Sequence, residues 1–279
     1  MPTFKRWLTA QEYERSYWEK TANRIATRAS GQLNWYAWRG TEMEKRLANH
    51  LDEDWKSTAK VLEIGSGPIG IVSFLRWGER YTIDPLEDFY LSNPALSHLR
   101  EATVHYGQGV GEALPFEDAS FSLVILDNVI DHVKNAEGVL KEIHRVLYED
   151  GLLYLAVNIH TRWGAVLHTA LSRLNIDKGH PYTFTVMSIK KFLLKNRFSI
   201  LSEEISDYYT AKEKDRNSSS LKDKIKGHTG LSEFIYYAVA TKIKEKIASK
   251  QFKDGLQGVY GYVEDRIFEK HKKLFLELK

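Results

Sequence analysis

The chain has 279 residues, a formal net charge of +3 and no cysteine. This length suffices for one sizeable hydrophobic core with additions. The absence of cysteine excludes disulfides, thiolate metal sites and catalysis by a cysteine nucleophile. No segment is apolar for long enough to span a bilayer, and Lys5 and Arg6 are not followed by the apolar core of a signal peptide. We therefore expect a cytoplasmic protein.

The first segment, residues 1–57, is rich in aromatic and basic side chains. Several of the aromatic residues recur at helical spacing, which predicts helices. Aromatic residues in such a pattern pack against a core more often than they contact a ligand. Tyr36 and Arg39 are the best candidates in this segment for contact with a cofactor.

The most informative motif is V-L-E-I-G-S-G-P-I-G at residues 61–70. A short apolar strand ends here in a loop, whose glycines Gly65 and Gly67 can adopt backbone angles closed to other residues. Because they have no Cβ, they also let a ligand approach the main chain closely. Pro68 suits the first turn of a following helix, where its missing N–H costs nothing. The motif predicts a nucleotide-binding loop.

The same loop also fits another cofactor class. Gly65, Gly67 and Gly70 spell the G-x-G-x-x-G of dinucleotide-binding dehydrogenases, in which an acidic residue follows about 20 positions later, as Asp84 does here. Asp84 ends a second apolar strand, and its two oxygens can accept hydrogen bonds from both hydroxyls of an unphosphorylated ribose. These two motifs alone leave the cofactor open.

Three later motifs decide between the cofactors. G-E-A-L-P-F covers residues 111–116, D-N-V-I-D-H-V covers 127–133, and E-I-H-R-V-L-Y-E-D-G-L-L covers 142–153. In this order and spacing the chain resembles the class I S-adenosylmethionine-dependent methyltransferases, of the type that modifies small molecules. Glu149 and Asp150 stand where that family usually has proline and glycine. The resemblance covers residues 60–242 and leaves a dehydrogenase as a minor alternative.

The resemblance implies S-adenosylmethionine as the cofactor and indicates where it binds. Main-chain N–H groups of Gly65, Ser66 and Gly67 would meet the methionyl carboxylate, and Asp84 would bind the ribose. Glu63, at the end of the first strand, would contact the cofactor or merely orient the loop.

The adenine and the methionyl group would have partners farther along the chain. By resemblance, Glu112 would accept a hydrogen bond from the adenine amino group, and Ala113 would offer its backbone to the ring. Asp127 and Asn128 would border the methionyl portion. In related enzymes a segment such as 1–57 folds over the cofactor, so we expect it to form an N-terminal helical lid that carries Tyr36 and Arg39.

Apolar strands alternate with helical segments along residues 58–242, the methyltransferase core, as in parallel sheets covered on both faces. We predict an α/β fold of the Rossmann-like, doubly wound type, with a mostly parallel seven-stranded sheet whose last strand is antiparallel. The predicted strands are residues 61–64, 81–83, 103–106, 122–126, 152–157, 198–205 and 234–242. Apolar residues at helical spacing predict a helix from 136 to 147.

Residues 158–186 form an insertion between the fifth strand and a helix that begins near Met187, long enough for a helix at 165–174. Long connections in open α/β sheets lie over the carboxyl ends of the strands, where ligands bind, so we expect the acceptor pocket here. A hydroxyl acceptor needs a general base, and histidine titrates closest to neutral pH. His132, His160 and His180 are the candidates, with structural packing the main alternative for His132. We predict no metal ligands.

The tail from 242 to 279 contains ten Lys and Arg against six Asp and Glu, so the rest of the chain is close to neutral. Apolar residues on one helical face predict a basic amphipathic extension over 243–279. It packs on its own domain, mediates a homodimer or makes peripheral contact with an anionic membrane surface. Residues 215–226, rich in serine, predict a mobile loop.

We therefore predict a methyltransferase that O-methylates a small molecule, a sugar or glycan, or a lipid-linked intermediate. Nucleic-acid binding depends on positive charges that contact phosphates, and the core is close to neutral. RNA methylation is therefore a minor alternative, together with N- and C-methylation. The alternative from another class is a non-catalytic partner or regulatory protein that binds S-adenosylmethionine. Turnover to S-adenosylhomocysteine distinguishes the two.

Overall fold

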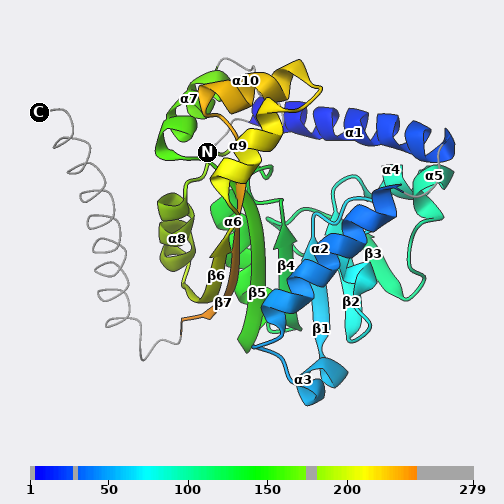
Figure 1. Ribbon diagram of the computed structural model, residues 1–279. Helices are drawn as coiled ribbons and strands as arrows, with labels where there is room; N and C mark the ends of the chain where they lie inside the picture. The colour runs from blue at the N-terminus through cyan, green and yellow to red at the C-terminus, as the bar shows by residue number, and fades with distance from the viewer. Residues whose placement is uncertain (1–3, 28–30, 174–180, 244–279) are drawn as a thin grey trace, which may run out of the picture. The chain divides into compact units, whose positions relative to one another are not determined.

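The computed structural model describes residues 4–27, 31–173 and 181–243. In this part of the chain seven strands form one sheet in the order β3-β2-β1-β4-β5-β7-β6 (Figure 1). Strands β1 to β5 pair in parallel, whereas β7 is antiparallel to both of its neighbours, β5 and β6. The predicted Rossmann-like, doubly wound fold with an antiparallel last strand is confirmed.

The strands are β1 (Lys60–Ile64), β2 (Glu79–Asp84), β3 (Val104–Gln108), β4 (Phe121–Asp127), β5 (Leu147–Ile159), β6 (Phe198–Ile205) and β7 (Phe234–Lys242). All seven were predicted, with boundaries within a few residues except at β5. This strand begins at Leu147, because Leu147 pairs with Phe121 before the register shifts. The turn that the family resemblance suggests at Glu149 and Asp150 is therefore extended strand.

The helices are α1 (Phe4–Thr27), α2 (Gly31–Leu47), α3 (Glu53–Thr58), the 3-10 helix η1 (Ile71–Phe74), α4 (Glu87–Ser92), α5 (Pro94–Ser97), α6 (Ala136–Val146), α7 (Arg162–Arg173), α8 (Val186–Lys195), α9 (Tyr208–Arg216) and α10 (Leu221–Thr229). Three of these helices correspond to expected ones. Helix α6 matches the helix expected at 136–147, α7 the one expected within the insertion 158–186, and α8 the one expected to begin near Met187.

Each face of the sheet has its own hydrophobic cluster, because side chains alternate along a strand. On β1, Leu62 and Ile64 pack with α6 and α8, whereas Val61 packs with the buried side chains of α2, η1, α4 and α5. Figure 1 shows α2 lying across one face of the sheet. Helices therefore cover both faces, and one of the covering helices comes from the N-terminal segment.

The segment after the glycine loop differs from the prediction. Pro68 lies in a turn, and only the four-residue helix η1 follows, so Pro68 does not begin a helix. Gly70 has a φ of 80° and Leu75 is already extended, so the backbone leaves little room for a longer helix. The buried Met43 and Leu47 of α2 pack in the same cluster as η1 and fill the face that a longer helix would cover.

The mobile loop predicted at 215–226 is wrong, because most of these residues belong to α9 and α10. Ser220, which we interpreted as loop composition, is the N-cap of α10 and accepts a hydrogen bond from the Asp223 N–H. Gly230 ends the same helix in the left-handed conformation, with a φ of 81°. The Arg216 side chain also donates to the Gly227 carbonyl at 3.1 Å, which joins the two helices.

The predicted basic extension at 243–279 falls, apart from residue 243, outside the described residues. Among the residues that the structure describes, no helix is both long and apolar enough to cross a bilayer.

The close approach of α2 to η1 generates a stability prediction. A Cβ on Gly40 would lie 3.1 Å from the Phe74 Cβ and 3.3 Å from the Ile71 carbonyl oxygen. The larger side chain in Gly40→Leu should overpack this contact and lower the free energy of unfolding by about 1–3 kcal/mol in urea denaturation. Thr41→Val, exposed on the same helix, is the matched control and should change it by less than about 0.5 kcal/mol. Equal effects of the two substitutions would contradict the proposed close packing.

Candidate functional site

A cavity of about 670 Å³ lies at the carboxyl ends of β1, β2 and β4. This volume is within the range of about 300–1,000 Å³ that is typical of small-molecule sites. The carboxyl ends of parallel strands are also where open α/β sheets bind ligands. The cavity walls comprise the glycine loop, the ends of the three strands, residues 109–112, residues 127–133 in part, and side chains of α1 and α2.

The glycine loop lines the cavity with the three residues predicted for it, Gly65, Ser66 and Gly67. Gly65 has a φ of 70° and Gly67 a φ of 60°, a region that other residues rarely adopt. A Cβ on Gly65 would lie 2.5 Å from a methyl group of Val129, and one on Gly67 would lie 2.8 Å from the Tyr36 hydroxyl. Glycine is therefore needed at both positions for two reasons: the backbone has a positive φ, and a Cβ would collide with Val129 or Tyr36.

Glu63 orients this loop. Its side chain is buried, and its two oxygens accept hydrogen bonds from the Ile71 and Val72 N–H groups at 3.1 and 2.8 Å. Burial raises the pKa of Glu63 to about 8, although the two N–H donors act in the opposite direction. Glu63 also reaches the cavity wall, but its main contacts hold the start of η1.

Asp84 fastens the other side of the loop. Its Oδ2 accepts from the Gly67 N–H at 2.9 Å, and its Oδ1 accepts from the Leu86 N–H at 2.8 Å. Burial, with smaller contributions from the nearby Glu14 and Glu87, raises the pKa of Asp84 to about 7. Each carboxylate oxygen has two lone pairs, so one N–H bond to each leaves acceptor capacity for two ligand hydroxyls.

Arg39 and Asp127 contact each other across the cavity wall. The Arg39 Nε donates to Asp127 Oδ2 at 2.8 Å, and Nη2 donates to Oδ1, so the pair is bidentate. Both side chains are nearly buried, and the guanidinium lies over the Trp35 ring. Asn128, beside Asp127, also lines the cavity, and its φ of 59° is unusual for a residue other than glycine. The ion pair fixes α2 to the end of β4.

Tyr36 lies directly against the glycine loop. Its ring is buried and stacks near Trp18 of α1, and its hydroxyl donates to the Ser66 carbonyl at 3.5 Å. Burial raises the pKa of the phenol well above its ordinary value, so it stays a hydrogen-bond donor. Trp18 in turn donates to Glu14 at 2.8 Å. These contacts link α1 and α2 to the loop.

Glu112 and Ala113 differ in their relation to the cavity. Glu112 lines it, and its Oε1 accepts from the Lys134 and Asn135 N–H groups, each at 2.9 Å. Ala113 is not among the lining residues, since its N–H donates to the Val110 carbonyl and Val110 occupies the wall instead. Ala113 is therefore not placed to contact a ligand in this cavity, whereas its bridge partner Val110 borders it.

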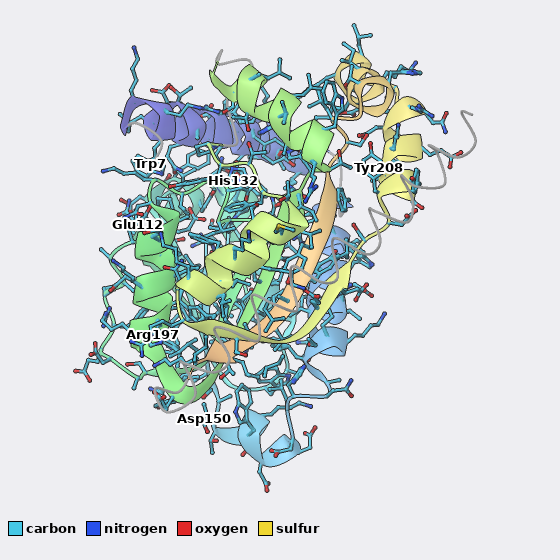
Figure 2. All side chains as sticks on the ribbon, turned by 90° about the vertical axis from the view of Figure 1, so that its left-hand side faces the viewer. Trp7, Glu112, His132, Asp150, Arg197 and Tyr208 are labelled. Atoms are coloured by element: carbon cyan, nitrogen blue, oxygen red, sulfur yellow. The ribbon has the colours of Figure 1, made fainter. Side chains whose placement is uncertain are left out.

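The three candidate bases have different positions. His132 lines the cavity, and its Nε2 lies 3.8 Å from an oxygen of the buried Asp131. Figure 2 shows His132 with Trp7 and Glu112 toward the α1 end of the sheet, whereas Asp150 and Arg197 lie at the other end. His160 is buried but does not line the cavity. His180 lies outside the described residues, so His132 is the better placed of the two described candidates.

From the sequence we expected a lid from residues 1–57 but did not single out the α1 side chains of the cavity wall, or Asp131. Trp7, Glu14, Tyr17 and Trp18 all line the cavity. Glu14 lies seven residues after Trp7, and Tyr17 and Trp18 lie three and four residues after Glu14, so all four share one helical face, and this pattern was a usable signal. Asp131 stood within the motif that we quoted, but only the fold shows that it is buried beside His132.

A family model described as a methyltransferase domain matches residues 62–155. The match begins in β1, includes the glycine loop, Asp84, Glu112 and Asp127, and ends in β5. No curated protein sequence matches the chain.

Several solved structures share the fold. A putative sarcosine dimethylglycine methyltransferase from Galdieria sulphuraria is 14% identical over 74% of this chain and 85% of its own, with a TM-score of 0.56. Geranyl diphosphate C-methyltransferase from Streptomyces coelicolor is 14% identical over 74% of this chain and 79% of its own, with a TM-score of 0.55. A putative methyltransferase from Bacillus halodurans is 19% identical over 73% of this chain and all of its own, with a TM-score of 0.53.

The buried Glu63 generates a pH prediction. Because its pKa in the folded protein is about 8, the folded state keeps a proton that the unfolded state releases near pH 4.5. Its contribution to the free energy of unfolding should therefore fall as the pH rises between these values, by up to about 1.4 kcal/mol per pH unit. Urea denaturation from pH 5 to 8 should show a flatter profile for Glu63→Gln than for the wild type. Glu117→Gln, on the surface, is the control, and a Glu63→Gln profile parallel to the wild type would contradict the prediction.

The matched region and the sheet order agree with the cavity. The glycine loop, the acidic end of β2 and the end of β4 meet at one edge of the sheet, in the arrangement that the sequence motifs implied. Residues 62–155 therefore carry a methyltransferase domain, and the sheet that contains them has the fold of the class I S-adenosylmethionine-dependent methyltransferases, with S-adenosylmethionine as the methyl donor.

Proposed function

We propose that this protein transfers the methyl group of S-adenosylmethionine to a hydroxyl oxygen of a small molecule. The observation that carries the proposal is that one cavity joins the glycine loop and Asp84 to His132 and to an aromatic wall from α1. The cofactor-binding groups and a general base therefore border the same space. Helices α1 and α2 act as the lid over it.

The donor groups of the cavity suit the cofactor. Asp84 has acceptor capacity for two ribose hydroxyls, and the Glu112 carboxylate suits the adenine amino group. Apart from Glu63, whose pKa is raised to about 8, the cavity wall contains Glu14, Asp84, Glu112 and Asp127, against Arg39 and His132 among the described basic residues. This excess of carboxylates favours a ligand that carries a positive sulfonium and an ammonium group. When bound, the cofactor supplies an activated methyl group.

The acceptor would lie against the α1 side of the cavity. Trp7, Tyr13, Tyr17 and Trp35 line the space rather than fill it, which favours an enzyme over a non-catalytic binding protein. Aromatic rings with polar tips suit an acceptor that has both an apolar face and hydroxyl groups, such as a sugar or a lipid-linked intermediate. The names of the similar Galdieria and Streptomyces structures, a sarcosine dimethylglycine methyltransferase and a geranyl diphosphate C-methyltransferase, support a small-molecule acceptor.

The insertion at 158–186 contacts residues 131–134, the turn that carries His132. This contact supports a role of the insertion in acceptor binding. The Tyr182 N–H donates to the Asp131 carbonyl at 3.2 Å, and the Tyr182 hydroxyl donates to the Lys134 carbonyl at 3.2 Å. None of the described residues of the insertion lines the cavity itself. We infer that this segment supports the turn that carries His132 and shapes the entrance for the acceptor.

His132 is the general base in this proposal. The imidazole would take the proton of the acceptor hydroxyl as the oxygen forms its bond to the methyl carbon. The resulting imidazolium would lie beside the buried Asp131 carboxylate, which stabilises the positive charge. An amine acceptor loses its proton more readily and has less need of this base.

The acceptor can be identified with a labelled-methyl screen. The full chain and S-adenosylmethionine with a labelled methyl group are incubated with fractionated metabolite and cell-wall extracts, and labelled products are identified by mass spectrometry. Formation of S-adenosylhomocysteine together with one labelled small molecule is the expected result. Label recovered only in RNA or protein would contradict the small-molecule acceptor, and cofactor binding without turnover on any fraction would favour the non-catalytic alternative.

The cofactor assignment is tested with Asp84→Ala. Loss of two hydrogen bonds to a charged group removes about 3 kcal/mol, so affinity for S-adenosylhomocysteine should fall by at least about 100-fold in calorimetry. Asp88→Asn, exposed four residues later, should bind as the wild type does. Circular dichroism and the Tm establish that Asp84→Ala is folded. An unchanged affinity in the folded variant would remove Asp84 from the cofactor site.

The base assignment is tested with His132→Gln and the identified acceptor. General-base catalysis contributes about 10²–10⁴-fold, so kcat should fall in this range while affinity for S-adenosylhomocysteine stays unchanged. The acid limb of the kcat profile against pH should also disappear. His98→Gln, on the surface, is the control. Full turnover by His132→Gln would contradict the role of His132.

A further inference from the structure

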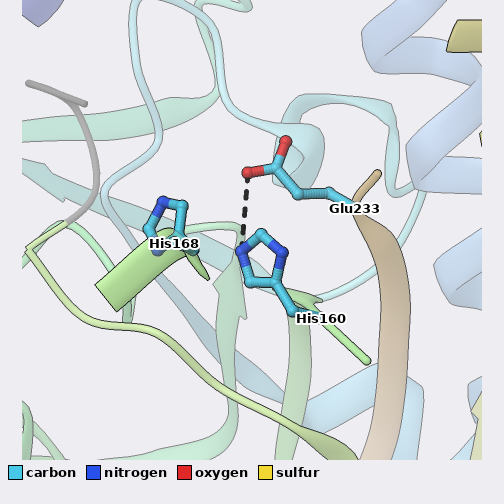
Figure 3. A group of neighbouring side chains, drawn as sticks. All are labelled: His160, His168 and Glu233. Atoms are coloured by element: carbon cyan, nitrogen blue, oxygen red, sulfur yellow. Dashed lines mark ion pairs between the residues drawn. The ribbon is translucent and has the colours of Figure 1, made fainter. Parts of the chain in front are cut away.

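His160, His168 and Glu233 form a group of metal-ligating side chains outside the cavity (Figure 3). His160 follows β5, His168 lies in α7, and Glu233 immediately precedes β7. One ligand atom from each residue lies within 4.8 Å of the others. The two histidines are 4% and 5% exposed, so the group is largely removed from solvent.

Hydrogen bonds orient the group from its outer side. The His168 Nδ1 lies 2.7 Å from the Thr183 hydroxyl, so Nε2 is the atom directed to the shared space. The Glu233 Oε2 accepts from Lys226 at 2.6 Å, while its Oε1 lies 3.8 Å from the His160 Nε2. Metal-binding histidines and carboxylates usually have such partners on their remaining polar atoms, which fix the tautomer and the orientation.

We propose that His160, His168 and Glu233 bind a divalent transition-metal ion, for which Zn²⁺ is the best match. Two imidazoles and one carboxylate, with a water molecule as the fourth ligand, form a common zinc coordination set. Tetrahedral coordination at about 2.0–2.1 Å brings ligand atoms to about 3.3 Å from one another. The His160 Nε2–Glu233 Oε1 distance of 3.8 Å is close to this value, and a ligand atom of His168 lies within 4.8 Å of both of the other ligand atoms.

The ion would link three segments that are distant in the sequence. It would tie the end of β5 to α7 and to the start of β7, and through Thr183 to the residues before α8. These segments include the described parts of the 158–186 insertion. The site lies apart from the cofactor cavity, so its role is to hold the insertion in place, and metal binding would stabilise the folded state. His160 then acts as a metal ligand and not as the base that the sequence suggested.

The test uses the full chain without a histidine tag, first stripped of metal with a chelator and then dialysed against Zn²⁺. Elemental analysis should find one zinc ion per chain, and Zn²⁺ should raise the Tm of the stripped protein. His168→Ala and Glu233→Gln should each lose at least 10-fold in zinc affinity and the gain in Tm. His98→Ala is the matched control, because His98 is a surface histidine at the end of α5. This variant should keep the zinc affinity and the gain in Tm of the wild type.

Metal content separates this proposal from the methyltransferase assignment, since the readout needs neither cofactor nor acceptor. Co²⁺, used in place of Zn²⁺, should give the visible absorption of a four- or five-coordinate ion in the wild type, and both ligand variants should lose it. The circular dichroism spectrum and a cooperative thermal transition of the stripped variants establish that they fold. Less than stoichiometric zinc in the wild type, or wild-type zinc affinity in either His168→Ala or Glu233→Gln, would overturn the proposal.

Discussion

The attachment of the glycine loop to two buried carboxylates is the interaction on which the rest of the site depends. Asp84 accepts from the Gly67 N–H, and Glu63 accepts from the N–H groups that begin η1. Burial raises the pKa of both carboxyl groups, which means that ionising them in this environment is unfavourable. In the complex that we propose, the positive sulfonium of S-adenosylmethionine would favour the ionised form of both groups.

The N-terminal helices depend on this loop in turn. Tyr36 packs against Gly67, where a side chain would collide with its hydroxyl, and Arg39 pairs with Asp127 at the end of β4. Trp18 of α1 packs against Tyr36 and Tyr90, so α1 is held through aromatic contacts. Hence the residues that close the cavity also complete one hydrophobic cluster of the sheet. This dual role explains why an aromatic-rich segment precedes the first strand.

The sequence allowed the whole sheet to be predicted, because short apolar strands separated by turns leave a local signal. It also placed Asp84, Glu112 and Asp127 on one cavity, because parallel strands present their carboxyl ends at the same edge. The predictions failed where the outcome depended on partners far away. The segment after Gly70 is only a four-residue helix because α2 occupies that face, and 215–226 is helical because Ser220 caps a helix that packs on α9.

The order of the strands and motifs indicated the fold class, and the family resemblance that those motifs carry indicated the cofactor. Tertiary structure alone decided which side chains pair. Arg39 and Asp127 are 88 residues apart, and only folding makes them partners instead of two separate ligand contacts. His160 was a candidate base in the sequence, but the fold places it with His168 and Glu233 and leaves His132 on the cavity. The reason is physical: hydrogen bonds and ion pairs depend on distances of a few ångströms, which local sequence patterns do not encode.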